Sequence, residues 1–397
     1  MSARLHFEKR EREMQEFPID VIVNILSRLP VKPLLRLRCV SKPFCALIDS
    51  RDFIKSHLKR SIETKTNLSL ILRDSYLYSL DLHSLSNIAI ELDHPLKSDD
   101  WGTEVLGSCN GLLCLYNCEE DIAIWNPSTR RHQRVPSEEI EFPYFGICQY
   151  VIYGFGYDPD TDDYKLVRLT QFYGKNDSDS FASEVKVYSM KSNSWRRIPD
   201  FPYHLKYKRC YGMLVRSALH WVVSRKAESD TANLIAAFDL STEQYLLVPQ
   251  PEFSGKDFHM NIRELEGCLC ILCNYIQERV DVWVMKDYGV KESWTKLFSV
   301  AQPEVIRSFE FVIPLAYSKG GHDVLLVQDN KKLVWFDVER KKIKKFKASG
   351  IPDYFESFLC VESLIPLSGG GETYGKNHDV KGKKKKKNTP KKNEKKR

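Results

Sequence analysis

The sequence predicts a two-part protein: a small α-helical unit followed by an all-β body, a propeller of about six blades. One observation is a hairpin pattern that recurs at intervals near 50 residues within residues 66–367. Such a period is typical of propellers, and kelch repeats lie close to it. The other is a run of apolar residues at helical spacing over residues 17–60. A charged leader (residues 1–16) and a Gly- and Lys-rich tail (residues 368–397), predicted to be disordered, complete the chain.

Four short helices are predicted in residues 17–60. The stretch "FPIDVIVNILSRLP" carries a proline at each end, where a proline suits a first helical turn or stops a helix. A second helix fits Pro33 to Val40. Ser41 is the predicted N-cap of a third helix that ends at Ile48, and a fourth runs from Asp52 to Lys59.

This helical zone is too apolar to stand alone. Of its 44 residues, 22 are apolar, and units this small usually need a partner or a staple. Composition alone favours packing of the helices on the β body, and docking onto a separate protein is the alternative.

The β body shows a strand, a polar pivot, a tight turn and a second strand, repeated six times, which predicts six blades. Six of the seven tryptophans lie in these strands and are expected to pack between blades. The stretch "ESFLCVESLIPL" is a candidate for closing the ring on the first blade. The pivots are Asp81, Asn126, Ser189, Asp239, Val284 and Asp337.

Charge is concentrated in the tail. Residues 380–397 hold eleven Lys or Arg and one Glu, or +10, so the remaining residues carry −3 of the net +7. The body therefore gives no support for specific nucleic-acid binding. The tail is either a solvated end or a nuclear-import signal, and nonspecific contact with RNA or anionic lipid is a further reading. The candidate import residues are Lys383, Lys384, Lys385, Lys386, Lys387, Lys391 and Lys392.

Membrane, metal and catalytic patterns are weak. No run of 18 apolar residues occurs, and residues 1–17 lack the apolar core of a signal peptide. Cys268, Cys270 and Cys273 alternate as buried strand residues do, without a second ligand pair for zinc. The "DPDTDD" stretch at Asp158–Asp163 lacks the Gly and Glu of a calcium loop and reads as an acidic hairpin turn. His220 is predicted to be a packed strand residue. We expect no bound metal and no cofactor.

The helical zone resembles the F-box motif of plants. Its matching phrases are "FPID", "ILSRLPVKPLL" and "RCVSKPFCALI", with Phe17, Pro33 and Phe44 departing from the usual Leu, Ser and Trp. The body resembles the divergent kelch-like, F-box-associated region of the same proteins, through "GSCNGLLCLY", "WNPSTR", "YGFGYDPDTDDYKLVR" and "DVWVMKDYGVKESWTKLF".

The resemblance implies a non-catalytic substrate receptor of a Skp–cullin–F-box ubiquitin ligase. The helices would bind a Skp-type adaptor and, through it, a cullin; the propeller would bind a target protein for ubiquitination and proteasomal degradation. Relatives act on immune receptors of the nucleotide-binding leucine-rich-repeat class, in plant defence. The expected location is cytoplasmic and nuclear. By motif, the adaptor contacts are Phe17, Pro18, Ile22, Ile25, Leu26, Leu29, Pro30, Leu34, Leu37 and Val40.

Target choice is expected to lie in propeller loops, since loops carry specificity on rigid scaffolds. The segment between Asn126 and Ser189, which includes "YGKNDSDSFAS", is one candidate. A different class of function stays open: a propeller enzyme or a lectin-like carbohydrate-binding protein with an incidental helical leader.

Overall fold

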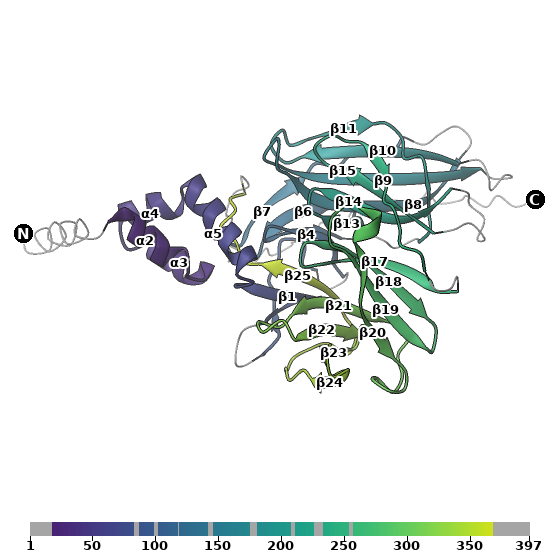
Figure 1. Cartoon of the computed structure of the whole chain (residues 1–397). Helices are drawn as coiled ribbons and strands as arrows, with labels where there is room; N and C mark the ends of the chain where they lie inside the picture. Colours follow the sequence, from purple (N-terminus) through teal and green to yellow (C-terminus); the bar gives the residue numbers. More distant parts are fainter. Residues whose placement is uncertain are drawn as a thin grey trace, which may run out of the picture.

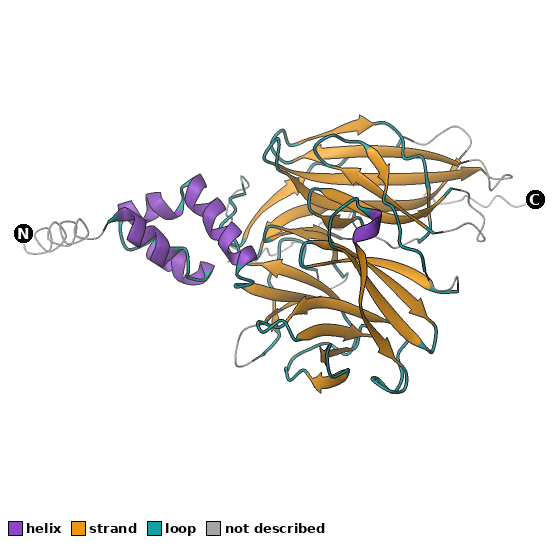
Figure 2. Ribbon diagram, viewed as in Figure 1, coloured by secondary structure: helices purple, strands orange, loops and turns teal. Residues whose placement is uncertain are grey.

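The computed structural model describes residues 18–82, 87–98, 102–117, 119–141, 146–174, 181–207, 211–225, 233–253 and 257–367. Within them, a helical unit projects from one side of a ring of six β-sheets (Figure 1). Figure 2 shows the same division, with the α-helices gathered in the projecting unit and strands making up the body. The predicted order, helices first and a six-bladed propeller second, is confirmed.

The helical unit (residues 18–63) contains four α-helices. As predicted, the Ser41 side chain caps the third by accepting a hydrogen bond from the Phe44 amide at 3.3 Å. The second helix begins at Val31, two residues before the predicted start, because Pro33 fits inside its first turn. The fourth extends past the predicted Lys59 to Glu63. The bounds are α2 Ile19–Leu26, α3 Val31–Leu37, α4 Lys42–Ile48 and α5 Arg51–Glu63.

Each sheet of the ring is a blade of antiparallel strands, listed from the inner to the outer strand. Blade 1 contains β25 (Glu356–Val361), β1 (Leu68–Arg73), β2 (Leu77–Asp81) and β3 (Ile90–Glu91). Blade 2 contains β4 (Glu104–Cys109), β5 (Leu112–Tyr116), β6 (Ile122–Asn126) and β7 (Arg131–Val135). Blade 3 contains β8 (Gly146–Asp158), β9 (Asp163–Gly174), β10 (Phe181–Ser189) and β11 (Ser194–Ile198).

Blades 4 to 6 follow the same plan, with two short inner strands in blade 4. Blade 4 contains β12 (His204–Leu205) and β13 (Met213–Val215) beside β14 (Ala218–Ser224), then β15 (Leu234–Asp239) and β16 (Tyr245–Leu247). Blade 5 contains β17 (His259–Leu265), β18 (Cys268–Tyr275), β19 (Arg279–Met285) and β20 (Trp294–Ala301), with a 3-10 turn at Lys291–Ser293. Blade 6 contains β21 (Val312–Tyr317), β22 (Asp323–Gln328), β23 (Lys332–Asp337) and β24 (Lys342–Lys345).

The six pivots all lie on the third strand of a blade, as the repeat requires. Five of them are the last residue of that strand, whereas Val284 is the last but one of β19. The turn at Asn110-Gly111 joins β4 to β5 with positive φ at both residues, which is the backbone that tight hairpins need.

The ring is closed as the sequence predicted. Strand β25, near the end of the described chain, pairs along its whole length with β1, from Leu68–Val361 to Arg73–Glu356. Blade 1 is therefore built from both ends of the folded chain, and the ladder between β25 and β1 joins them.

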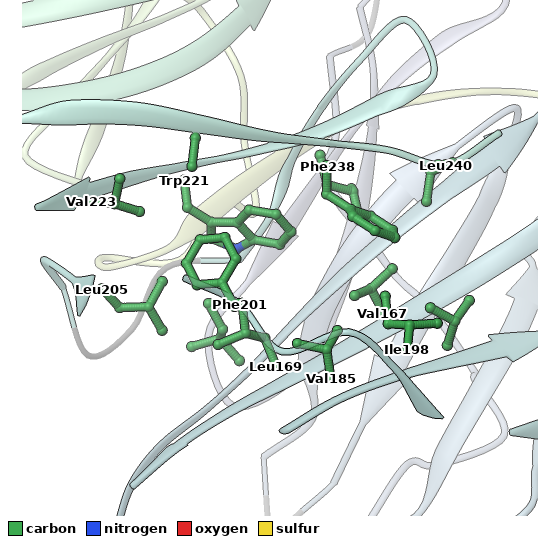
Figure 3. Packing of buried hydrophobic residues seen from close by; sticks show 14 residues of the cluster. Val167, Leu169, Val185, Ile198, Phe201, Leu205, Trp221, Val223, Phe238 and Leu240 are labelled. Carbon is green, nitrogen blue, oxygen red and sulfur yellow. The ribbon is translucent and has the colours of Figure 1, made fainter. Parts of the chain in front are cut away.

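The cores lie between neighbouring blades. Figure 3 shows the core of blades 3 and 4, in which Trp221 and Phe238 of blade 4 face Val167 and Leu169 of blade 3. Trp125 is similarly buried between blades 1 and 2. Because each blade buries one face against the next, the expected role of these tryptophans in blade packing is confirmed for this pair.

The long interval between Asn126 and Ser189 comes mainly from strand length. Strands β8 and β9 have 13 and 12 residues, longer than the other strands described. Residues 175–180 of the candidate loop lie outside the described residues. The extra residues therefore build blade 3 more than they build a loop.

Candidate functional site

The helical unit has a small core of its own. Leu26 and Leu34, 4% and 0% exposed, pack with Val31, Ile48 and Phe53. Both were predicted adaptor contacts, and the structure places them inside the unit. Their burial serves the packing of α2, α3 and α4 against one another.

Other predicted contacts lie at the surface. Ile25 and Val40 are 55% and 56% exposed, and Pro18 and Pro30 are exposed as well. Ile22, Leu29 and Leu37 are half-buried against the core of the unit. Phe17 and the seven tail lysines lie outside the described residues.

The sequence analysis missed two exposed apolar residues of α2. Ile19 and Val21 are 59% and 42% exposed. The signal for them was present, because six of the eight residues of α2 are apolar and only Asp20 and Asn24 are polar. Asp20 and Asn24 lie four residues apart on one side of the helix, and the rest of its surface is apolar. Helix α2, at the far end of the unit from the propeller in Figure 1, therefore exposes apolar side chains beside these two polar residues.

We define the adaptor face as the exposed apolar residues of α2 with the exposed valine after α3. An isolated apolar side chain on a surface is ordinary, but several on one short helical unit indicate an association surface. An apolar helix side laid in a groove is a common form of protein recognition. The adaptor face consists of Ile19, Val21, Ile25 and Val40.

The adaptor face is bordered by charge. Arg38 and Asp49 form an ion pair at 2.6 Å. The hydrogen bond to Asp49 raises the pKa of the Arg38 guanidinium. Arg28 donates to the Asn24 side chain at 2.9 Å. A charged border around an apolar centre is the usual composition of a protein interface.

Helix α5 fixes the unit to the propeller. Arg51 and Lys55 both pair with Asp162, in the turn between β8 and β9, and the Lys55 pair measures 2.7 Å. Lys65, just after α5, pairs with Glu266 in the turn between β17 and β18. The acidic turn at Asp158–Asp163, predicted as a hairpin rather than a calcium loop, is thus part of the joint.

The segment after the ring strengthens the joint. We call residues 362–367 the strap. Leu364 is part of the core of the helical unit, and the Val31 amide, at the start of α3, donates to the Glu362 carboxylate. The Asn126 side chain donates to the Ser363 and Ile365 carbonyls at 3.1 and 3.0 Å. The strap therefore binds the helices on one side and blade 2 on the other.

Two faces of the ring are distinguished by this joint. Asp162 and Glu266 lie in turns between first and second strands, so these turns occupy the face near the helices. Successive strands are antiparallel, so the turns between second and third strands lie on the opposite face. The end of β9 and the start of β10, which the candidate segment "YGKNDSDSFAS" connects, lie on that opposite face.

His220 and the three cysteines of β18 are packed strand residues. His220 is fully buried, with its two ring nitrogens 3.1 Å from the Met213 carbonyl and 2.6 Å from the Tyr288 hydroxyl, and burial lowers its pKa to about 4. Cys270 and Cys273 are free and buried in β18, and Cys268 is half-buried. Among the described residues, no group of three or more His, Cys, Asp and Glu is placed to hold a metal. None of the helices in those residues has the length and apolar content to cross a membrane.

Comparisons with known proteins cover both parts of the chain. Residues 14–56 match the F-box domain, and residues 68–364 match the F-box associated beta propeller domain. F-box protein CPR1 of Arabidopsis thaliana is 44% identical over 89% of this chain and 89% of that protein. F-box protein At4g22390 is 38% identical over 89% and 90%. F-box/kelch-repeat protein At3g23880 of the same plant is 33% identical over 79% and 86%.

Similar solved structures are distant. An oligogalacturonate lyase from Vibrio parahaemolyticus covers 72% of this chain and 76% of its own, at 11% identity and a TM-score of 0.42. A likeness at that level carries no argument about function. The domain matches span the helical unit and the ring in the order the structure shows, and the chain belongs to the family of F-box proteins with an F-box-associated β-propeller.

Proposed function

We propose that this protein is the substrate receptor of a Skp–cullin–F-box ubiquitin ligase. The F-box unit binds a Skp-type adaptor through the adaptor face, and the adaptor connects it to a cullin. The observation that carries the proposal is the exposure of Ile19, Val21 and Ile25 on a helical unit that already has a closed core. Water contact with these side chains is unfavourable, and binding of an apolar groove removes it.

The receptor performs no chemistry of its own. Its effect is to hold a target protein near a ubiquitin carrier, which raises the effective concentration of target lysines. The ion pairs of α5 and the strap support this role, because a fixed joint keeps a constant distance between the adaptor face and the propeller. We propose a protein target, with nucleotide-binding leucine-rich-repeat immune receptors as its class, and a location in cytoplasm and nucleus.

The test of adaptor binding compares two neighbouring residues with different burial. Ile25→Asp places a charge on the adaptor face, and we expect adaptor affinity to fall by about a hundredfold or more while the protein stays folded. Leu26→Asp is unsuitable, because it puts a charge in the core of the unit. Binding is measured by calorimetry with purified adaptor.

The matched control is Ile276→Asp. Ile276 is 64% exposed on the propeller, so the chemical change is the same and the place differs. It should leave adaptor affinity unchanged. Full-strength adaptor binding by the Ile25→Asp protein would refute the proposed face.

A further inference from the structure

A cavity of about 660 Å³ lies inside the ring. Inner strands of all six blades line it, including β4, β8, β13, β17, β21 and β25. Pockets that bind ligands typically measure about 300–1,000 Å³, so the cavity has the room for a peptide side chain with part of its backbone.

One cluster of polar groups lies at the end of this channel away from the F-box. Strand β25 runs from Glu356 to Val361, and the Glu362 carboxylate that follows it accepts from an F-box amide. Strand β17 likewise ends at the turn that Lys65 reaches. The first residues of the inner strands therefore lie at the opposite mouth. Tyr211, His259 and Glu356 line the cavity there, and Arg73 and Glu104 lie beside them at the same end of blades 1 and 2.

Most of these groups satisfy one another. The Tyr211 hydroxyl donates to Glu104 at 2.6 Å, and Arg73 donates to the Thr103 carbonyl at 3.0 Å. Arg73 also lies 3.8 Å from Glu104 and 3.4 Å from Glu356. This cluster is a fixed polar border around the mouth of the channel.

Arg263 of β17 is the exception. Its only hydrogen bond to a described residue runs from Nη1 to the Ile262 carbonyl at 3.1 Å, and no described carboxylate lies within ion-pair distance. Burial in the channel lowers the pKa of its guanidinium, and the charge of Glu356 acts in the opposite direction. A guanidinium has five N–H donors, so most of the donors of Arg263 have no acceptor among the described residues.

One further unpaired group lies nearer the mouth. The Asn274 Oδ1 atom is buried without a hydrogen bond in the described structure, whereas Glu356 Oε2 has the Arg73 guanidinium 3.4 Å away. Asn274 pairs in register with His259, four residues from Arg263 along β17. At the rise of an antiparallel strand this separation is about 14 Å, which an extended peptide of about four residues spans.

We propose that the channel, from this mouth inward to Arg263, binds an acidic peptide segment of the target protein. Arg263 donates to the carboxylate of an Asp or Glu side chain in the target. Asn274 accepts from an N–H group of the same segment. A planar guanidinium matches a carboxylate with two parallel hydrogen bonds, so the acidic residue is the specific contact. This inference rests on the proposed receptor function and gives it a substrate class.

The test uses the full chain bound to its adaptor and two hexapeptide mixtures. One mixture carries Glu at a fixed position, the other Gln, and the remaining positions are random in both. Fluorescence anisotropy should show the Glu mixture binding about tenfold more tightly, the value of one hydrogen bond to a charged group. Arg263→Gln should remove this preference, and Arg263→Lys should keep part of it.

The matched control is Arg307→Gln, an exposed arginine on the loop before β21, which should keep the full preference. Equal binding of the two mixtures by the wild type, or a preference that survives Arg263→Gln, overturns the proposal. Competition by free glutamate as strong as that by the Glu mixture overturns the peptide assignment in favour of a small carboxylate. Adaptor binding is measured on the same samples, so a failure of the receptor function is seen separately from a failure of the channel site.

Discussion

Asp158 is a buried carboxylate that joins two blades. It accepts hydrogen bonds from Thr161 and Ser241, both at 2.6 Å, and lies 2.8 Å from the Lys165 ammonium. Burial acts to raise its pKa, but these bonds outweigh burial and hold the pKa well below its usual value. Since Ser241 belongs to blade 4, the carboxylate connects blades 3 and 4 through a hydrogen bond.

Replacement of this carboxylate should lower the stability of the folded protein. We expect Asp158→Asn to lower the free energy of unfolding by about 3–5 kcal/mol, because Lys165 loses a buried partner. The folded pKa is depressed, so the stabilisation is present above about pH 4 and is lost as the pH falls toward the folded pKa. Urea unfolding at neutral pH measures the loss. Asp160→Asn, an exposed change in the same turn, is the control and should stay within about 0.5 kcal/mol.

Two buried histidines give a second dependence on pH. Burial lowers the pKa of His94 and of His220 to about 4. In the unfolded chain these histidines take up a proton near pH 6.5, whereas in the folded protein they stay neutral down to about pH 4. The free energy of unfolding therefore falls as the pH drops from about 6.5 to 4, by about 2 kcal/mol for each histidine at pH 5. Urea unfolding at pH 7.5 and pH 5 should show a smaller difference for His220→Gln than for wild type. His322→Gln, at an exposed site, should leave the difference unchanged; an equal change in both variants would contradict the assignment.

At the scale of elements, the strap makes the F-box and the propeller one structure. Leu364 packs with Phe53 and Ile54 of α5 and with Leu34 of α3. Gly111, in the turn of blade 2, lies so close to the strap that a Cβ there would stand 2.4 Å from the Ser363 side-chain oxygen, and equally close to the Val361 carbonyl oxygen of β25. A side chain at Gly111 would therefore displace the chain that leads into the F-box core.

Truncation of Leu364 should loosen the F-box selectively. Leu364→Ala removes a buried side chain at a cost of about 2–5 kcal/mol, and the loss should appear as faster amide exchange in α2 to α4. Exchange in blades 3 to 5 should stay at wild-type rates. Leu333→Ala, a change of the same type in blade 6, is the control and should leave F-box exchange unchanged. Uniform acceleration over the whole chain by Leu364→Ala would contradict a selective role of the strap.

The positions of helices and strands were predicted better than the side of each helix that faces the core. The repeat of pivots located six hairpins, and Pro18 and Ser41 located the starts of α2 and α4, because these signals are local. Pro33 did not locate the start of α3, which begins two residues earlier. Val284 was one residue from the strand end, where β19 carries an irregular register beside Trp283. The sequence could not separate Ile25 from Leu26, since α2 is apolar on both sides and the inward side is set by packing with α3, α4 and the strap. Arg263 gave no signal either, because its position in the channel depends on the closed ring.

At the scale of the molecule, one strand holds both parts together. β25 closes the ring by pairing with β1, and the strap that follows it enters the core of the F-box. A break at this strand therefore opens the propeller and removes a core residue of the F-box at once. The adaptor face and the channel mouth depend on the same closure, although they lie at opposite ends of the molecule.

Two truncations separate closure from the tail. A chain that ends at Asp353 lacks β25 and the strap, leaves β1 without its inner partner and exposes the unpaired edge of β1. We expect it to lose cooperative thermal unfolding and to lose adaptor binding. A chain that ends at Leu367 keeps all six sheets and the strap, so its Tm should stay within about 2 °C of the full chain. Differential scanning calorimetry with adaptor binding on the same samples checks both. A chain ending at Asp353 that unfolds cooperatively and still binds adaptor would show that the ring and the F-box fold without β25, and would refute their dependence on one closure.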